Sequence, residues 1–221
     1  MHITVVIDVL RFTTSACAAF THGVKSIIPV GTIAEARAFK HQGFRVAGEL
    51  DGLKLDFADY GNSPSDFDTP EIAGSTIAYS TTNGTKALVL AAENGPVVIA
   101  AFPNLHAVAA WLKIQNSDVV ILCSGWKNLV CVEDTLCAGA LTALLLETGN
   151  FGTNCDSAEI ALSYWKQAQN NPAEYVEKAS HYSRLINLGV NPMLGYSLQI
   201  GTSAVVPVFN NGSITDWNTE N

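Results

Sequence analysis

The stretch Ser75-Thr-Ile-Ala-Tyr-Ser-Thr-Thr-Asn-Gly-Thr-Lys86 carries the most informative structural signal in the sequence. Its first part, 75–79, is an apolar, β-branched run typical of a buried strand. Residues 85–94 are rich in alanine and leucine and predict a helix. The turn between them would present hydroxyls, an amide and free helix N–H groups to one point, which suits a phosphate or a carboxylate. The same turn also fits a helix cap with a purely structural role.

Two further strand-like runs end in polar residues of the same kind. The run 2–7 leads into a helix of small residues, and the run 119–123 leads through Ser124-Gly125 into another helix. Ligands of open α/β sheets bind beyond the carboxyl ends of the strands, so we expect one shared site at this edge. The polar residues in question are Asp8, Arg11, Thr13 and Thr14 after the first run, and Glu133 and Asp134 after the second.

Strand and helix patterns alternate along the chain, which predicts a layered α/β/α fold with a largely parallel or mixed sheet. We expect a single unit over residues 1–221, in which the helix-rich stretch 150–190 forms an appended subdomain or a lid. The long polar connection 50–74 is expected to be functional, because loops of that length in compact domains usually are. The predicted strands are 2–7, 26–30, 45–47, 75–79, 97–101, 119–123 and 204–209, followed by a polar tail over 210–221.

Composition narrows the function classes. The chain has 221 residues, 48% of them hydrophobic, and a formal net charge of −8, which argues against binding to nucleic acid or to anionic membranes. No window approaches 18 consecutive apolar residues, so no membrane span is expected. The start at Met1 lacks the features of a signal peptide, which predicts a cytoplasmic protein. The apolar composition is compatible with a homodimer.

The cysteines and histidines show no metal-binding or disulfide pattern. There are five cysteines without a CxxC motif, and Cys17 and Cys137 fall in predicted helices as small buried residues. No pair of histidines has the spacing of zinc ligands, so a zinc site is not expected. The sequence also lacks the GxxxxGK[ST] and GxGxxG phosphate-binding motifs.

Carboxylates at the predicted site point to a magnesium ion. Asp8 ends a strand, Glu49 follows one, and Glu133 and Asp134 begin a helix. Each alone also fits a turn anchor or a helix-dipole partner. Together they would supply oxygen ligands for Mg²⁺, which would offset the negative charge of the protein around an anionic ligand. Arg11 would clamp a phosphate or carboxylate, unless it forms an ordinary salt bridge.

Six blocks of the sequence match one known family in order and spacing. They are Asp8-Val-Leu-Arg-Phe-Thr-Thr14, Gly48-Glu49, Gly61-Asn-Ser-Pro64, Thr81-Thr-Asn-Gly-Thr85, Asn104 and Glu133-Asp-Thr-Leu-Cys-Ala-Gly139. As a set they resemble the 2-phosphosulfolactate phosphatase family over most of the chain. The resemblance implies an α/β, Mg²⁺-dependent acid phosphatase that removes phosphate from 2-phosphosulfolactate, or a related 2-phospho-hydroxyacid, in the route to coenzyme M. Members usually carry a further segment before the first strand, so either that segment is dispensable or an edge of the fold is missing.

At the positions that match the family's motifs, the chemistry of the residues suggests three groups of site residues. The metal ligands would be Asp8, Glu49 and Asp134, and the catalytic residues Arg11 and Glu133, with Glu133 as the general acid or base. The groups facing the phosphate and the sulfonate would be Thr13, Thr14, Asn62, Ser63, Thr81, Thr82, Asn83, Gly84 and Thr85.

Two rival functions stay open at this level. A non-catalytic sensor of a phosphorylated or sulfonated small acid would bind the ester without turning it over. A lyase or isomerase would change the carbon skeleton instead of releasing phosphate. For the phosphatase, attack by water and a covalent intermediate are equally compatible with the residues.

Overall fold

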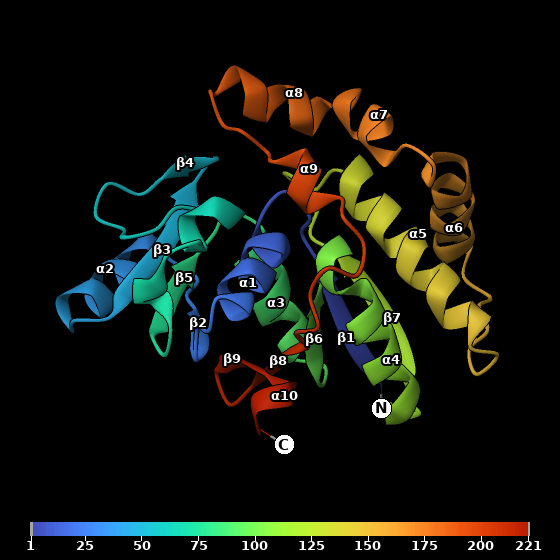
Figure 1. Ribbon diagram of the computed structural model, residues 1–221, viewed down its shortest axis with the longest axis horizontal. Coiled ribbons are helices and arrows are strands. Elements are labelled where there is room, and N and C mark those ends of the chain that lie inside the picture. Colours follow the sequence, from blue (N-terminus) through green and yellow to red (C-terminus); the bar gives the residue numbers. More distant parts are fainter. Residues whose placement is uncertain (1, 221) are drawn as a thin grey trace.

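Nine strands form one mixed sheet between two layers of helices, in the order β4-β3-β5-β2-β9-β8-β6-β1-β7 (Figure 1). The structure, a computed structural model, describes residues 2–220. The strands are β1 (His2–Ile7), β2 (Ser26–Pro29), β3 (Arg45–Leu50), β4 (Leu53–Lys54), β5 (Thr76–Ser80), β6 (Val97–Ala100), β7 (Asp118–Cys123), β8 (Pro207–Asn210) and β9 (Ser213–Asp216).

The helices connect and cover these strands. The α-helices are α1 (Phe12–Thr21), α2 (Ile33–His41), α3 (Gly84–Ala92), α4 (Leu105–Gln115), α5 (Val132–Glu147), α6 (Asp156–Ala168), α7 (Pro172–Glu177), α8 (Ser180–Asn187), α9 (Leu194–Ser197) and α10 (Trp217–Glu220). The 3₁₀-helices are η1 (Pro64–Phe67), η2 (Pro70–Ile72) and η3 (Phe102–Asn104). The predicted layered α/β fold with a mixed sheet is therefore confirmed.

Two parallel groups of strands make up the sheet. One group is β6-β1-β7 and the other is β3-β5-β2. The antiparallel hairpin β8–β9 joins them, because β8 pairs with β6 and β9 pairs with β2. The C-terminal segment thus completes the middle of the sheet and lies far along the chain from its neighbours.

The hairpin corrects the predicted polar tail. We expected one strand over 204–209 and no structure after it, whereas two strands and a short helix fill 207–220. Asn211 and Gly212 form the turn, with φ angles of +49° and +85°. Positive φ at both positions is the two-residue turn that an Asn-Gly pair favours between strands. The local signal was present, but the polar flanking residues obscured it.

Helices cover both faces of the sheet, which explains why its strands read as continuous apolar runs. Alternate residues of β1 face opposite layers: Val5 and Ile7 pack with α4 and α5, and Val6 packs with α1 and α3. In the other group, Ala78 of β5 packs with Ala36 of α2 on the face opposite α1. The expected burial of Cys17 and Cys137 is confirmed, and all five cysteines are free.

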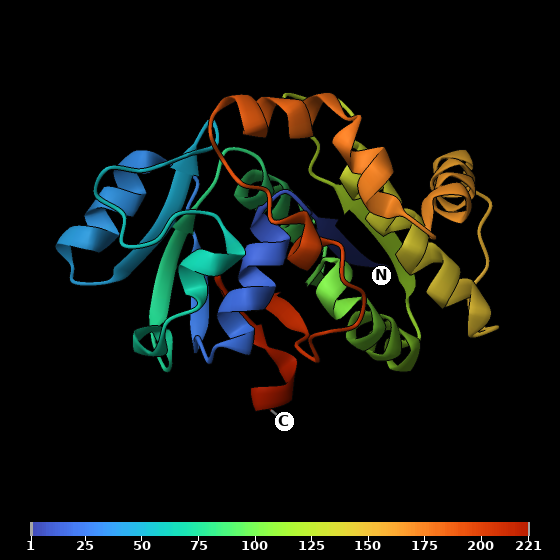
Figure 2. The same ribbon diagram turned by 45° about the horizontal axis from the view of Figure 1, so that its top comes forward.

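The helix-rich segment 150–190 lies along one edge and then crosses the top of the molecule. α6 packs on α5, where the carbonyl of Ala161 comes so close to Gly139 that an added Cβ would lie 2.1 Å from it. From there α7 and α8 run across to the turn between β3 and β4, as both views show (Figure 1, Figure 2). The connection 50–74 contains β4, η1 and η2, so it is more regular than a plain loop. Within residues 2–220 no helix is long and apolar enough to span a membrane.

Candidate active site

A small cavity opens where the ends of β1, β3 and β5 meet α8. Its volume is about 20 Å³, which is room for roughly one water molecule. Six of its lining residues are predicted site residues: Asp8, Arg11, Glu49, Asn62, Thr82 and Asn83. The other lining residues are Leu10, Asp51, Gly52, Trp126, His181, Arg184 and Leu185. The structure thus brings these six residues together at the strand ends, and their roles stay predictions.

Asp8 is the buried carboxylate at the end of β1. Burial raises its pKa to about 6, and the negative charges of Glu49 and Glu133 act in the same direction. The charge of His181 and a backbone hydrogen bond from Phe12 oppose this shift. Gly84, the first residue of α3, packs directly on this carboxylate, since an added Cβ would lie 2.5 Å from Asp8 Oδ2. The N-terminus of α3 therefore packs directly against the Asp8 carboxylate.

Glu49 connects the end of β3 to the neighbouring turns. The backbone N–H of Thr82 donates to Glu49 Oε1 at 2.6 Å, and the Thr82 hydroxyl donates to Oε2 at 3.0 Å. The backbone N–H of Gly52 also donates to Oε2, at 2.6 Å. These bonds hold the carboxylate in one orientation beside the cavity, and Oε1 keeps a lone pair for a further ligand.

Arg11 is buried, with 7% of its surface exposed, and donates from Nη2 to the carbonyl of Gly52 at 2.7 Å. Asn62, at the start of the Asn-Ser-Pro turn, accepts the hydroxyl hydrogen of Tyr79 at its Oδ1, with a separation of 2.6 Å. Arg11 does not form the alternative salt bridge to Asp8 that the sequence left open. Its guanidinium thus faces the cavity with most of its donors still available.

Several predicted substrate-binding hydroxyls bond within the chain and do not line the cavity, so their role toward a substrate stays a prediction. Thr13 donates to the Asp8 carbonyl at 2.9 Å, and Thr14 donates to the Val9 carbonyl at 2.8 Å, so both close the turn after β1. Thr81 and Thr85 bond to each other across the start of α3. Ser63 donates to Met193 Sδ at 3.3 Å. These four threonines and the serine do not line the cavity. Their hydrogen bonds shape the turns whose other residues line it.

Asp134, a predicted metal ligand, uses both oxygens on backbone groups. Oδ1 accepts from the N–H of Val9 at 2.8 Å, and Oδ2 accepts from the N–H of Gly125 at 3.1 Å. Burial, followed by the charges of Glu133 and Asp8, raises its pKa well above the ordinary range. The residue ties the end of β1 to the turn after β7 and is not part of the cavity wall. Its role as a metal ligand stays a prediction.

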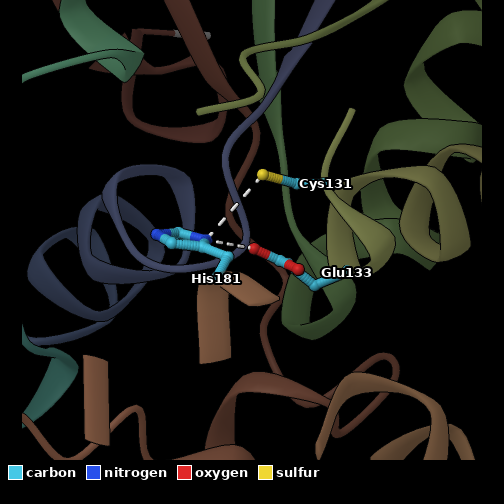
Figure 3. Close-up of side chains that lie close together, drawn as sticks. All are labelled: Cys131, Glu133 and His181. Carbon is cyan, nitrogen blue, oxygen red and sulfur yellow. Dashed lines mark hydrogen bonds and ion pairs between the residues drawn. The ribbon is translucent and has the colours of Figure 1, made fainter. Parts of the chain in front are cut away.

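Glu133, the predicted general acid or base, lies behind the cavity and not in its wall. It is 1% exposed, its Oε1 is 2.5 Å from His181 Nδ1, and its Oε2 has no hydrogen-bond partner. Cys131 completes this group, with Sγ 3.8 Å from the same nitrogen (Figure 3). Over residues 2–220, these three side chains form the one trio of His, Cys, Asp or Glu whose ligand atoms lie within 4.8 Å of one another.

Three of the seven lining residues that the sequence did not predict come from α8, and they include its histidine and its arginine. His181 and Arg184 lie one turn apart on that helix and both line the cavity. Trp126 contacts both: its ring stacks on that of His181, with centroids 6.0 Å apart and an interplanar angle of 9°, and the Arg184 guanidinium carbon lies 4.8 Å from the Trp126 centroid. No local motif marks α8 as part of a site. Its strong segregation of apolar and polar residues shows only that one face is buried.

The charges around the cavity alternate in sign. Asp8 and Glu49 are opposed by Arg11, Arg184 and the first turn of α3. Although the protein as a whole carries a net charge of −8, it places two arginines in the wall of this cavity. Such a set suits a small molecule with several negative charges, together with a cation between the two carboxylates.

Comparison with known proteins agrees with this picture. Residues 1–212 match the family model described as 2-phosphosulpholactate phosphatase. A protein of Caldanaerobacter subterraneus subsp. tengcongensis, named probable 2-phosphosulfolactate phosphatase, is 32% identical over 214 residues, covering 95% of this chain and 88% of that protein. Proteins of the same name from Thermotoga maritima and a Synechococcus strain are 34% and 38% identical, covering 94% and 84% of this chain and 89% and 79% of their own lengths. The chain therefore belongs to the 2-phosphosulfolactate phosphatase family, a family of phosphoric monoester hydrolases.

Proposed function

We propose that this protein is a Mg²⁺-dependent phosphatase that hydrolyses 2-phosphosulfolactate, or a closely related 2-phospho-hydroxyacid, to the hydroxyacid and phosphate. The observation that carries the proposal is the cavity in which Asp8 and Glu49 face Arg11 and Arg184. Family membership and the names of the relatives support the same reaction.

The residues present fit a magnesium ion. Asp8 and Glu49 offer carboxylate oxygens, and Asn62 and Thr82 offer neutral oxygens beside them. Magnesium is bound in proteins by one or two carboxylates together with water and substrate phosphate oxygens. The raised pKa of Asp8, about 6, reflects a buried charge next to another negative charge, which a divalent cation would relieve. When bound, the ion would neutralise the charge that develops on the phosphoryl oxygens and help to orient water.

The cationic side chains suit a substrate with several negative charges. 2-Phosphosulfolactate carries a phosphate, a carboxylate and a sulfonate on a three-carbon skeleton. Arg11 is anchored by one hydrogen bond to Gly52 and keeps its remaining donors for an anionic oxygen. The N–H groups at the start of α3 lie beside Asp8 and favour a phosphate at the same place. Catalysis would thus depend mainly on positioning and electrostatic stabilisation.

The chain also controls access of water. The cavity is smaller than the proposed substrate, so α8 and the turn at Asp51-Gly52 separate when the substrate enters and close over it afterwards. Closure strengthens each electrostatic interaction inside the site, because bulk water is excluded.

Phosphate release from synthetic 2-phosphosulfolactate tests the proposal. We expect release with Mg²⁺, loss of release with excess EDTA, and recovery when Mg²⁺ is added back. A thermal shift with the ester but no released phosphate would favour a sensor. A changed carbon skeleton without free phosphate would favour a lyase or isomerase.

A further inference from the structure

The trio Cys131, Glu133 and His181 has no place in the reaction described so far, although one member lines the cavity. Two readings are open to it: a second metal site, or a proton-transfer pair. The distances decide between them. Two ligands of one tetrahedral zinc ion, each at about 2.0–2.1 Å from it, lie roughly 3.3 Å apart. His181 Nδ1 and Glu133 Oε1 are 2.5 Å apart, which is the separation of a short hydrogen bond and not of two metal ligands.

Cys131 lies beside this pair as a third, buried member of the trio. A cysteine binds metal as the thiolate. Burial, followed by the charges of Glu133, Asp134 and Asp8, holds the pKa of Cys131 well above its ordinary range. In the metal-free protein the sulfur is therefore a thiol, and the shortest polar contact of the trio is the one between Glu133 and His181.

This hydrogen bond fixes the orientation of the imidazole. An ionised carboxylate can only accept, so with Glu133 ionised the Nδ1 atom carries the hydrogen and donates. The ring is also held by stacking on Trp126. Figure 3 shows the second ring nitrogen on the side of the ring away from Glu133 and Cys131. Because His181 lines the cavity, Nε2 is the nitrogen that can reach a molecule bound there.

The surroundings of the ring suit a proton donor. Glu133 and Asp8 are carboxylates whose charges act around it, the Arg184 guanidinium lies 4.8 Å from the centroid of the Trp126 ring, and the Cys131 sulfur is 3.8 Å from Nδ1. The negative charge of buried Glu133 balances the positive charge of a protonated ring. His181 supplies the imidazole among the residues lining the cavity, and imidazole is the side chain most often used as a general acid or base.

We propose that His181 is the catalytic general acid of the phosphatase, and that Glu133 is the positioning residue that orients it. The proposal rests on the phosphatase function proposed above. The P–O bond to the alcohol oxygen breaks, its electron pair stays on that oxygen, and the proton on His181 Nε2 moves to it. Water supplies the new oxygen of inorganic phosphate, and one of its protons returns the ring to its starting state.

A comparison of two esters tests the role of His181. The leaving alkoxide of 2-phosphosulfolactate needs a proton, whereas the phenolate of 4-nitrophenyl phosphate leaves without one. For His181→Asn we expect kcat/KM to fall about 10²–10⁴-fold on 2-phosphosulfolactate, the usual contribution of a general acid, and less than about tenfold on the aryl ester. His41→Asn, on the exposed surface of α2, is the matched control and should leave both rates unchanged.

Two further variants separate catalysis from structure. Imidazole added to His181→Ala should restore part of the turnover of 2-phosphosulfolactate, which a purely structural role would not allow. Glu133→Gln keeps an acceptor for Nδ1 but removes the charge, so kcat should fall on 2-phosphosulfolactate with KM unchanged.

Four results would overturn the proposal. They are equal losses on both esters, absence of imidazole rescue, a His181→Asn rate within tenfold of wild type, and one tightly bound transition-metal ion per chain that Cys131→Ser releases. If wild-type protein releases no phosphate from 2-phosphosulfolactate, the proposed function itself fails, which is a different outcome.

Discussion

Arg184 on α8 and Asp51 in the turn after β3 are joined across the top of the cavity. Arg184 Nη2 donates to the Asp51 carbonyl at 2.5 Å and lies 3.7 Å from its carboxylate. The two residues are 133 positions apart in the sequence, so this contact connects the helical segment 150–190 to the sheet. It holds α8 in place over Asp8 and Glu49, which lie beneath it in the cavity wall.

Arg184→Gln should weaken substrate binding and closure. We expect kcat/KM for 2-phosphosulfolactate to fall by about 10–100-fold, mainly through KM, because the variant loses a cation beside the bound anions. Steady-state phosphate release measures this. Arg37→Gln removes a surface cation paired with Asp56 on α2 and serves as the control, with unchanged kinetics expected. Equal KM values for Arg184→Gln and wild type would contradict the role of Arg184.

Magnesium binding should depend on pH through Asp8. Its pKa is about 6 in the metal-free protein, and a protonated carboxyl does not bind Mg²⁺. The affinity should therefore rise about tenfold for each pH unit below about 6 and level off above it. Isothermal titration of Mg²⁺ between pH 5 and 7.5 measures this. A flat profile over that range would show that Asp8 is not a ligand.

Asp8→Asn should stabilise the metal-free protein near neutral pH. The ordinary pKa of 3.8 rises to about 6 in the fold, so between these values the native state binds more protons than the unfolded state. The contribution of Asp8 to the free energy of unfolding is thus present below about pH 4 and lost above about pH 6. The gap between the two values corresponds to at most about 3 kcal/mol.

An asparagine has no charge to bury, so we expect a gain of about 1–3 kcal/mol at pH 7.5 and little change at pH 4. Urea unfolding in EDTA at both pH values checks this prediction. A variant less stable than wild type at pH 7.5 would contradict it.

Asp134→Ala should be strongly destabilising. The substitution leaves the N–H groups of Val9 and Gly125 without their acceptor, one of them buried at the end of β1. We expect a loss of about 2–4 kcal/mol in the free energy of unfolding, since each unpaired buried group costs about 1–3 kcal/mol. Asp118→Ala, at the exposed start of β7, should change it by less than about 0.5 kcal/mol. Similar values for the two variants would refute the anchoring role of Asp134.

Two glycine substitutions should separate activity from stability. In Gly84→Ala the new Cβ would lie 2.5 Å from Asp8 Oδ2 and 2.6 Å from buried Phe12, so both side chains must shift, and turnover should fall by about 10–100-fold in the protein that still folds. In Gly139→Ala the Cβ would lie 2.1 Å from the Ala161 carbonyl, where α5 and α6 cross outside the cavity wall. That variant should lose about 1–3 kcal/mol of stability and keep its kcat. Normal kcat in folded Gly84→Ala would contradict the close packing of α3 on Asp8.

The fold could be predicted where the local hydrophobic pattern of a segment matches its burial in the folded protein. The buried strands such as 75–79 are continuous apolar runs because helices cover both faces of the sheet. The turn after β5 was predicted correctly as a strand-to-helix turn at the site, and Thr82 and Asn83 do line the cavity. The hairpin at Asn211-Gly212 was missed because its strands are short and its partners, β2 and β6, are distant in sequence.

The remaining parts of the site depend on contacts that no local pattern encodes. A threonine that follows a strand can cap the next helix or bind a ligand, and the sequence does not distinguish the two roles. Only the folded chain shows that Thr13 and Thr85 bond to backbone groups. Glu133 was selected as an acid or base by its charge, but its partner His181 lies 48 positions away on another helix. This long-range packing places the proposed general acid His181, the cation Arg184 and the helix α8 that carries them at the cavity.

The measurement that tests the central claim most directly is phosphate release from 2-phosphosulfolactate by wild type and Asp8→Asn, each with Mg²⁺ and with EDTA. The account predicts release by wild type only when Mg²⁺ is present. It also predicts at least about 100-fold slower release by a folded Asp8→Asn variant, whatever the Mg²⁺ concentration. Equal release by both proteins, or wild-type release that EDTA does not change, would contradict it.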